Sequence, residues 1–323
     1  MVKHISIENF KSIKHLEFEA KRVNIFIGEP NTGKSNILEA LGSFTPDGEL
    51  KDKIRFKKQD DIFHDNEVAN KIRIIADELF SEFLHKNNNP IQHEVLKKIT
   101  NDEENLYNTI TRKRDGNFVV LSADSNPFRY YLFKHLESYS VEEKTYLLPV
   151  YGQNLFSILR MHKQIREMVA ELLLQKGYRL NLRVNEKEIE IMREDNGVFI
   201  SYPYQTLSDT LQRIIFYTAA IESNKNAVLL FEEPEANTFP FYTKELGERI
   251  AYDEANQYFI ITHNPYFLMA LVEKTPTIDL NVFITYMDDY QTKVHRIADE
   301  ELSEVVDLNT SIFFNLDKFL APA

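Results

Sequence analysis

Several features are scarce in this 323-residue sequence, and each absence excludes a class of protein or site. There is no cysteine, which rules out disulfides, thiolate metal sites and cysteine nucleophiles. No apolar run approaches the roughly 20 residues that a transmembrane helix needs. The first ten residues, MVKHISIENF, lack the apolar stretch of a signal peptide. We therefore expect a cytoplasmic protein with no membrane partner.

Positive charge is also in deficit, because the formal net charge is −12. This balance argues against a protein built wholly to coat nucleic acid. Two basic clusters, Lys51–Lys58 and Arg112–Arg114, are typical of solvated surface. A local patch that faces DNA remains the alternative interpretation, so nucleic acid stays open as a partner.

The hydrophobic pattern predicts an α/β fold. His4–Phe10 and Leu16–Glu19 alternate as half-buried antiparallel strands do, and Val23–Ile27 is an apolar run typical of a buried strand. Tyr178–Val184 and Glu188–Met192 predict a β-hairpin, with a further turn at Asn196-Gly197.

Towards the C-terminus, apolar strands alternate with helical patterns. Strands are expected at Ala227–Phe231 and Tyr258–Thr262, and helices at Leu207–Glu222 and Thr243–Ala255. Such alternation implies a largely parallel sheet. Residues 81–177 differ in character and predict a mostly helical insertion or lid, which leaves 1–80 and 178–323 as the core.

A phosphate-binding loop lies between the strand at Val23–Ile27 and the helix that follows. The segment matches G-x-x-x-x-G-K-[ST] and consists of Gly28, Glu29, Pro30, Asn31, Thr32, Gly33, Lys34 and Ser35, followed by Asn36. Inward-facing N–H groups and the helix N-terminus bind phosphates. Lys34 would reach the β- and γ-phosphates, and the Ser35 hydroxyl would ligate Mg²⁺. The chain has only 9 glycines, and two of them fall at the required spacing.

Polar residues end two of the buried strands, where α/β proteins place ligands. Glu232 and Glu233 follow Val228–Phe231, so Glu232 is expected to hold the Mg²⁺ shell and Glu233 to orient or deprotonate water. His263 follows the next strand and could contact the γ-phosphate or the attacking water. We therefore take Lys34, Glu233 and His263 as catalytic candidates.

A third segment, Ser208-Asp209-Thr210, opens the helix at Leu207–Glu222. By itself this segment indicates an ordinary capped helix N-terminus. It comes shortly before the strand that ends in the paired glutamates, which gives it a second interpretation once the other motifs are considered.

The order and spacing of these motifs resemble the ABC-type ATPase heads of the SMC, RecF and OLD families, most closely the compact OLD-like ATPases of prokaryotic defence systems. The matching segments are Ile7–Ile13, Gly28–Ala40, Leu207–Asp209, Phe231–Asn237 and Thr262–Pro265. The resemblance implies a P-loop NTPase fold, an ABC-type head of 1–80 and 178–323 with a mixed sheet and N-terminal antiparallel strands.

The resemblance also implies a homodimer or higher oligomer in which two heads sandwich two ATP molecules, with Mg²⁺ as the second cofactor. Ser208, Asp209 and Thr210 would then contact the ATP of the opposite copy. Glu232 stands where these families usually have Asp, and Thr210 where they have Gly, so slow hydrolysis is expected. Gln59 is the candidate for the glutamine that senses Mg²⁺.

Three functions follow from this resemblance. The first is an ATP-driven switch that controls a separately encoded effector, such as a nuclease in antiviral defence. Only 60 residues follow His263, too few for a nuclease domain of ordinary size. The others are a DNA-repair or chromosome-maintenance ATPase that binds nucleic acid directly, and an ATP-dependent scaffold that barely hydrolyses.

Overall fold

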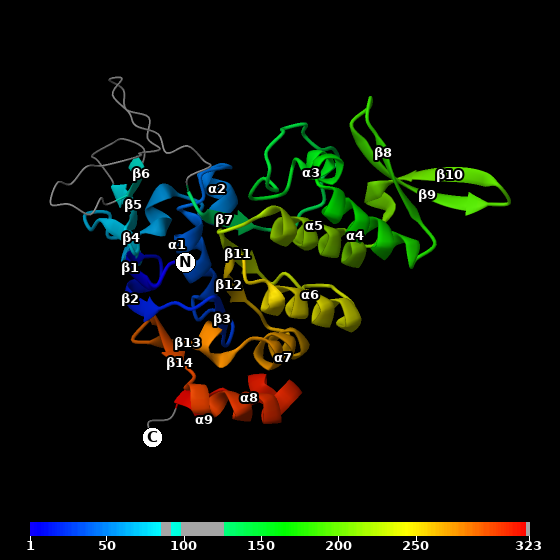
Figure 1. Cartoon of the computed structure of the whole chain (residues 1–323). Helices are drawn as coiled ribbons and strands as arrows, with labels where there is room; N and C mark the ends of the chain where they lie inside the picture. The colour runs from blue at the N-terminus through cyan, green and yellow to red at the C-terminus, as the bar shows by residue number, and fades with distance from the viewer. Residues whose placement is uncertain (85–91, 98–125, 321–323) are drawn as a thin grey trace, which may run out of the picture.

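The computed structural model describes residues 1–84, 92–97 and 126–320 (Figure 1). Its central sheet has the strand order β14-β13-β3-β12-β11-β7. All neighbouring strands are parallel except β14, which is antiparallel to β13. The strands are β3 (Val23–Ile27), β7 (Phe128–Tyr131), β11 (Val228–Glu232), β12 (Gln257–Ile261), β13 (Leu280–Asp288) and β14 (Gln291–Arg296). The predicted α/β fold with a largely parallel sheet is confirmed.

A second, antiparallel sheet has the strand order β2-β1-β4-β5-β6. Its strands are β1 (His4–Phe10), β2 (Ile13–Glu19), β4 (Ile72–Ala76), β5 (Leu79–Leu84) and β6 (Gln92–Lys97). Ile7 pairs with Leu16 across the first hairpin. The expected N-terminal antiparallel strands are therefore confirmed.

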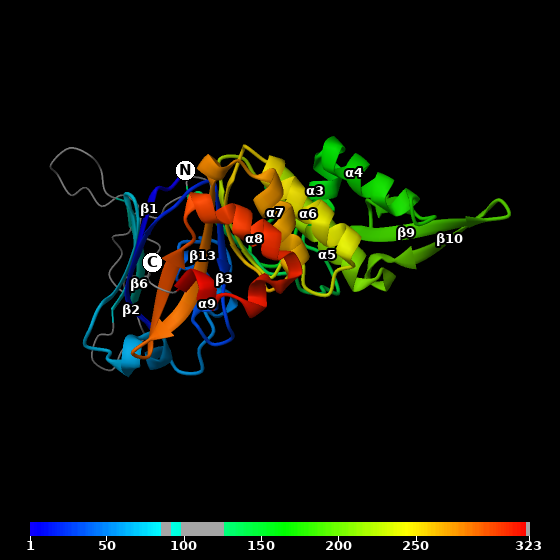
Figure 2. The same ribbon diagram turned by 90° about the horizontal axis from the view of Figure 1, so that it is seen from below.

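The central sheet is covered on both faces. Successive side chains along each strand point to opposite faces, so each strand contributes to two separate layers of packing. Val228 and Leu230 pack with α1 (Lys34–Gly42) and the antiparallel sheet, whereas Leu229 and Phe231 pack with helices on the other face. Figure 2 shows the antiparallel strands on one side of the central sheet and α5–α7 on the other.

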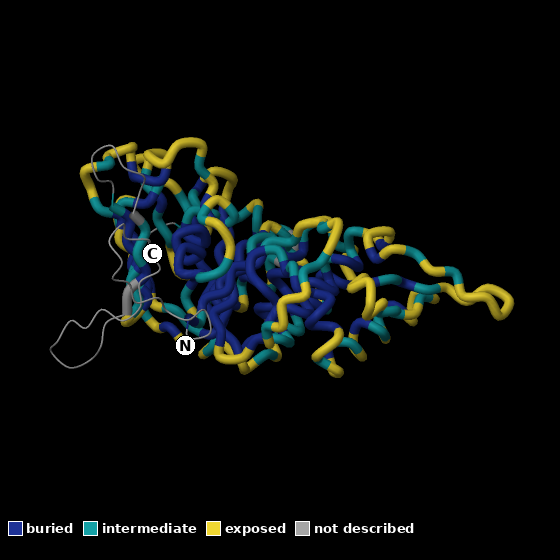
Figure 3. The backbone as a smooth tube through the Cα atoms, turned by 90° about the horizontal axis from the view of Figure 1, so that it is seen from above, coloured by how far each residue is buried: buried dark blue, intermediate teal, exposed yellow. Residues whose placement is uncertain are grey.

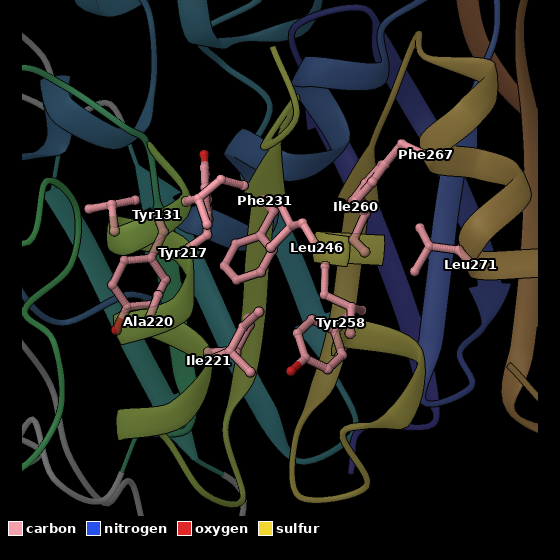
Figure 4. Close-up of a cluster of buried hydrophobic side chains, with 14 of the residues drawn as sticks. Tyr131, Tyr217, Ala220, Ile221, Phe231, Leu246, Tyr258, Ile260, Phe267 and Leu271 are labelled. Atoms are coloured by element: carbon pink, nitrogen blue, oxygen red, sulfur yellow. The ribbon is translucent and has the colours of Figure 1, made fainter. Parts of the chain in front are cut away.

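The helices on that second face are α5 (Asp209–Ser223), α6 (Pro240–Tyr252) and α7 (Pro265–Lys274). Figure 4 shows their side chains against Phe231, Tyr258 and Ile260 of the sheet. Shorter helices are α2 (Leu50–Lys53), α8 (Leu302–Leu308) and α9 (Asp317–Leu320). Among the described residues, no helix is long and apolar enough to cross a membrane.

A three-stranded arm projects from the body of the molecule (Figures 1 and 3). Its strands are β8 (Arg179–Arg183), β9 (Glu188–Asp195) and β10 (Val198–Pro203), in the order β10-β9-β8. The turn at Asn196 and Gly197 has positive φ at both positions, 49° and 85°, as a tight hairpin requires. The predicted hairpin and turn are both confirmed.

The part of 81–177 that the structure describes contains both helices and strands, and the expected helical insertion as a whole stays a prediction. Helices do occur, at α3 (Leu155–Met161) and α4 (Lys163–Leu174). However, β6 extends the antiparallel sheet, and β7 pairs with β11 at the edge of the central sheet. Short strands such as β7, with four residues, carry too little periodicity to predict. Arg112–Arg114 lies outside the described residues.

Candidate functional site

The phosphate-binding loop lies where the sequence predicts it, between β3 and α1. Glycine is required at both ends of this loop. Gly28 has φ 148°, and a Cβ there would lie 2.3 Å from the Thr285 carbonyl oxygen. Gly33 has φ 91°, and a Cβ there would lie 1.9 Å from Thr292 Oγ1. These close approaches to β13 and β14 fix the loop at the carboxyl edge of the sheet.

Lys34 is the first residue of α1, and its side chain folds back over the loop. Its Nζ donates hydrogen bonds to the carbonyl oxygens of Gly28 (2.9 Å) and Glu29 (2.6 Å). Burial lowers the pKa of Lys34 to about 8, and the nearby carboxylates of Glu233 and Glu29 oppose that shift. The ammonium group therefore lies among oxygen acceptors, at the place where phosphate oxygens are expected.

Ser35 and Glu232 meet at the start of α1. The Ser35 hydroxyl donates to Glu232 Oε1, and the Tyr130 hydroxyl donates to Glu232 Oε2 at 2.9 Å. Burial, and then the charge of Glu232, raises the pKa of Tyr130 well above its usual value, so the phenol remains a donor. Because Mg²⁺ prefers hydroxyl and carboxylate oxygens, the Ser35–Glu232 pair fits the expected metal.

Arg55 joins Glu232 to a buried carboxylate of α1. Its Nη2 lies 3.3 Å from Glu232 Oε1, and its Nε donates to Glu39 Oε1 at 2.5 Å. The Glu39 side chain is only 1% exposed and also accepts from Lys11 Nζ. Sequence reasoning assigned no role to Lys11, Glu39, Arg55 or Tyr130. One signal in the sequence could have indicated these contacts: Glu39 is a charged residue on the apolar side of the predicted helix, and a buried carboxylate needs basic partners.

Glu233 and His263 face each other beyond the ends of β11 and β12. His263 Nε2 lies 3.5 Å from Glu233 Oε1. Burial and the charge of Lys34 lower the pKa of His263, although Glu233 and Glu232 partly offset this effect. These effects favour the neutral imidazole, which donates a hydrogen bond from one ring nitrogen and accepts one at the other. The parallel pairing of β11 with β12 brings these two residues together.

Glu235 is hydrogen-bonded to the residue that precedes His263. Its Oε1 accepts a hydrogen bond from Thr262 Oγ1, and the same hydroxyl accepts from the Asn264 backbone N–H at 3.0 Å. Asn264 in turn caps α7 by accepting from Tyr266 N at 2.9 Å. Burial raises the pKa of Glu235 to about 7. Hydrogen bonds thus connect the segment that carries His263 to a buried carboxyl group whose pKa is raised.

Ser208, Asp209 and Thr210 form the N-terminus of α5, hereafter the signature tip. Ser208 is the N-cap and accepts from Leu211 N at 3.4 Å. Asp209 lies 2.9 Å from His135 Nε2 and 3.5 Å from Arg213 Nε. Thr210 donates to the Asn237 carbonyl oxygen at 3.2 Å, which links the tip to the turn after Glu235.

A cavity of about 430 Å³ lies over the phosphate-binding loop. The residues that line it are Lys11, Ser12, Pro30, Asn31, Thr32, Gly33, Lys34, Ser35, Asn36, Glu39, Arg55 and His263. The signature tip is not among them. Gln59 is not among them either; it begins the 3₁₀ helix η1 (Gln59–Ile62) and is exposed. Of the basic cluster Lys51–Lys58, only Arg55 lines this cavity.

Three comparisons relate the chain to known proteins. The family described as AAA ATPase domain matches residues 1–208. The DNA replication and repair protein RecF of Rickettsia prowazekii (strain Madrid E) is 28% identical over 134 residues, 38% of this chain. The match spans only 36% of that protein.

Two solved structures resemble nearly the whole chain. One is an SMC head bound to the C-terminal winged-helix domain of ScpA, with TM-score 0.56 and 14% identity, covering 94% of this chain and 99% of that one. The other is an SMC head with an extended coiled coil, bound to the C-terminal domain of ScpA derived from Pyrococcus furiosus. Its TM-score is 0.54 at 12% identity, covering 95% and 98% of the two chains. At these identities the likeness establishes the fold.

Proposed function

Because this chain belongs to the AAA ATPase domain family and folds as an ATPase head of the SMC/RecF class, we propose that two copies close around two ATP molecules and hydrolyse them. The observation that carries the proposal is the convergence of Lys34, Ser35, Glu232, Glu233 and His263 at one edge of the sheet. The proposal rests on their contacts rather than on the motif alone.

Each of these residues has a distinct role in the proposal. The loop N–H groups and Lys34 bind the phosphates, which replace the carbonyl oxygens that Lys34 now contacts. Ser35 and Glu232 hold Mg²⁺, which neutralises charge on the phosphate oxygens when bound. Glu233 orients or deprotonates the attacking water, and neutral His263 donates a hydrogen bond to the γ-phosphate or that water.

The homodimer is proposed because half of the expected site lies elsewhere on the same chain. The signature tip does not line the cavity over the phosphate-binding loop. Ser208 is exposed, and the Asp209 side chain is 33% exposed. In a head-to-tail dimer, the tip of one copy would contact the γ-phosphate held by the other, where its helix N-terminus favours negative charge.

For the biological role, we propose a cytoplasmic, OLD-like switch that controls a separately encoded effector, such as a nuclease in antiviral defence. Support comes from Glu232 and Thr210, which replace the usual Asp and Gly of the resembled families. Slow hydrolysis would hold each dimer closed for seconds, and a long-lived closed state suits a switch. The partner protein would then sense the closed or open dimer.

The RecF similarity favours a second candidate, a repair ATPase that binds DNA directly. A hollow next to the ATP site is lined by the basic residues Lys11, Arg55 and Lys57, by Phe56 and Phe63, and also by Asp61, Asp65 and Asn66. Stimulation of ATP hydrolysis by duplex DNA separates the two candidates. An effect of DNA severalfold above background would favour the repair ATPase, whereas no effect would favour the effector switch. A scaffold that barely hydrolyses would show a dimer without measurable turnover.

The decisive experiment uses Glu233→Gln, which removes the proposed base and keeps the shape of the side chain. Loss of a general base costs about 10²–10⁴-fold in turnover. We therefore expect Mg-ATP to trap a dimer that sedimentation velocity detects at micromolar concentration. Glu245→Gln is the matched control, because Glu245 is half-exposed on α6 and its ion-pair partner is Arg249 of the same helix; it should leave turnover unchanged. A variant that binds ATP and stays monomeric would refute the dimeric site.

A further inference from the structure

Three large aromatic side chains, hereafter the aromatic rim, are exposed beside the catalytic edge. Phe239, Phe241 and Tyr266 are 65%, 63% and 52% exposed. Phenylalanine is among the residues that folded proteins bury most often, so neighbouring exposed rings call for an explanation. Their position in the fold supplies one.

The rim lies at the N-termini of α6 and α7. Because β11 and β12 are parallel, both helices begin at the edge of the sheet that carries Glu233 and His263. The two helices pack closely, since a Cβ at Gly247 of α6 would lie 2.8 Å from Ala270 of α7 (Figure 1). The rim therefore lies at the same edge of the sheet as the proposed ATP site, although its three residues do not line the cavity over the phosphate-binding loop.

The turn that carries Phe239 is held firmly. Thr238 Oγ1 donates to the Glu235 carbonyl oxygen and lies 2.6 Å from Thr243 Oγ1. Thr243 is fully buried. The Phe239 carbonyl oxygen accepts from Tyr242 N at 2.9 Å, and Pro240 is the first residue of α6. A rigid turn that presents aromatic rings loses little entropy when a partner covers it.

The rim is also continuous with the signature tip. Thr210 donates to the Asn237 carbonyl oxygen, only two residues before Phe239. No charged residue occurs from Asn237 to Thr243, whereas Lys11, Arg55 and Glu39 crowd the other side of the site. Aromatic enrichment with depletion of charge is typical of the centre of a protein interface.

We propose that the aromatic rim is the apolar anchor of the interface with a second copy of this chain, buried when ATP closes the dimer. The inference rests on the proposed dimeric site, because it requires that the adjoining signature tip reach the partner's nucleotide. It adds the residues that contribute most of the contact energy. The signature tip would recognise the phosphate, and the rim would supply the affinity.

The absence of cysteine allows a direct test, because a single introduced thiol has no background. Phe239→Cys is combined with Glu233→Gln and treated with a maleimide with and without Mg-ATP. We expect labelling to slow by about tenfold or more when the dimer closes, in proportion to the fraction of dimer. Phe314→Cys is the control, because Phe314 is 88% exposed on the C-terminal 3₁₀ helix η7 (Asn309–Phe314).

A second variant, Phe239→Ser with Phe241→Ser, tests the energetic role in the same Glu233→Gln background. We expect unchanged Mg-ATP binding by the monomer and dimerisation weakened by about tenfold or more, as for interface anchors. Equal labelling with and without ATP while the dimer forms, or an unchanged dimer affinity, would refute the role proposed for the rim and leave the dimeric ATP site standing. A Glu233→Gln protein that binds ATP and remains monomeric would overturn the proposed dimeric site and the rim with it.

Discussion

The two halves of the proposed ATP site differ in how they are built. At the phosphate-binding loop, side chains from separate parts of the chain form one connected network. Lys11, Glu39, Arg55, Tyr130 and Glu232 are linked by hydrogen bonds and ion pairs, and Glu39 is almost fully buried. At the signature tip, Ser208 is exposed and caps its own helix, and Asp209 and Thr210 make separate contacts with His135, Arg213 and the Asn237 carbonyl oxygen.

This difference indicates which half is complete within one copy. A network of paired charges built around the buried Glu39 is costly to disturb, so it fixes Ser35 and Glu232 before any ligand arrives. A capped helix N-terminus that faces outward has unused N–H dipoles and little to lose by docking. Changes to the first half should therefore impair a single chain, and changes to the second half should impair only the assembly.

The largest effect is expected for Lys34→Ala, which acts on the complete half. Charged hydrogen bonds contribute about 1.5–3 kcal/mol each, so the loss of one or two weakens Mg-ATP binding by at least about tenfold. Turnover should fall below detection. Isothermal calorimetry and phosphate release measure the two effects.

The matched control for that change is Lys163→Ala, because Lys163 is 76% exposed on α4, remote from the loop. Circular dichroism should show both variants folded. A Lys34→Ala protein that binds and hydrolyses ATP as the parent does would contradict the roles assigned to this half of the site.

A smaller effect is expected for Ser208→Asp at the signature tip. Aspartate caps a helix as well as serine does, so α5 remains folded. The added carboxylate would face the partner's γ-phosphate, and like-charge repulsion should lower turnover by about tenfold or more. Monomeric ATP binding should not change.

The control at this position is Ser208→Asn, which also caps the helix and carries no charge. It should keep most of the parent's turnover. Equal turnover of the Asp and Asn variants would show that the tip lies far from any phosphate and would remove the distinction between the two halves.

Much of the complete half could be predicted from the sequence. The phosphate-binding loop has a fixed spacing and sits between a strand and a helix. Glu232, Glu233 and His263 end two parallel strands, so their convergence follows from topology. The position of the loop and this convergence could be predicted because each motif is local and the rule that brings the strands together is general, whereas the roles of these residues stay predictions.

The remaining contacts could not be predicted, because they join segments with no shared pattern. Arg55 and Tyr130 reach Glu232 from 177 and 102 residues away in sequence. Tyr130 lies on β7, a strand of four residues within a region expected to be mostly helical. Gln59 is the candidate that the resemblance offers for the glutamine that senses Mg²⁺, whereas Arg55, four residues earlier, is the residue that lines the cavity.

A moderate effect of pH is expected on the affinity for Mg-ATP, and it arises from Lys34 in the half of the site that is complete within one copy. Burial lowers the pKa of Lys34 to about 8, and bound phosphates should raise it again. The free protein therefore loses this proton as pH rises above about 8, whereas the ATP complex keeps it. Affinity for Mg-ATP should fall by up to about tenfold between pH 7 and pH 9, because each lost proton contributes at most a factor of ten per pH unit.

Calorimetry at pH 7, 8 and 9 measures this dependence, and heats in two buffers of different ionisation enthalpy count the protons taken up. Lys34→Arg should bind without the pH dependence, because a guanidinium group stays charged throughout this range. Constant affinity of the parent from pH 7 to pH 9 would show that Lys34 keeps its charge despite its burial.

The smallest effect is expected where the two halves depart from the resembled families. The proposed switch requires turnover at or below about 1 s⁻¹, the bottom of the usual enzyme range. Glu232 carries one more methylene than Asp, about 1.5 Å of reach, and its oxygens are held by Ser35 and Tyr130. In the proposed dimer, Thr210 would place a side chain where the backbone approaches the partner's phosphate, and its hydroxyl donates to the Asn237 carbonyl oxygen.

Combining Thr210→Gly with Glu232→Asp restores the family pattern in both halves, and we expect turnover to rise by a few-fold. The gain is limited because Asp would lose its contact with Tyr130, and because Gly in the first turn of α5 costs about 1 kcal/mol of helix stability. The single variants, assayed for phosphate release beside the double variant, assign the gain to one half or the other. If the double variant is no faster, or the parent already turns over tens of times per second, these departures do not set the rate. The switch would then lose its main support, and a repair ATPase would explain the chain at least as well.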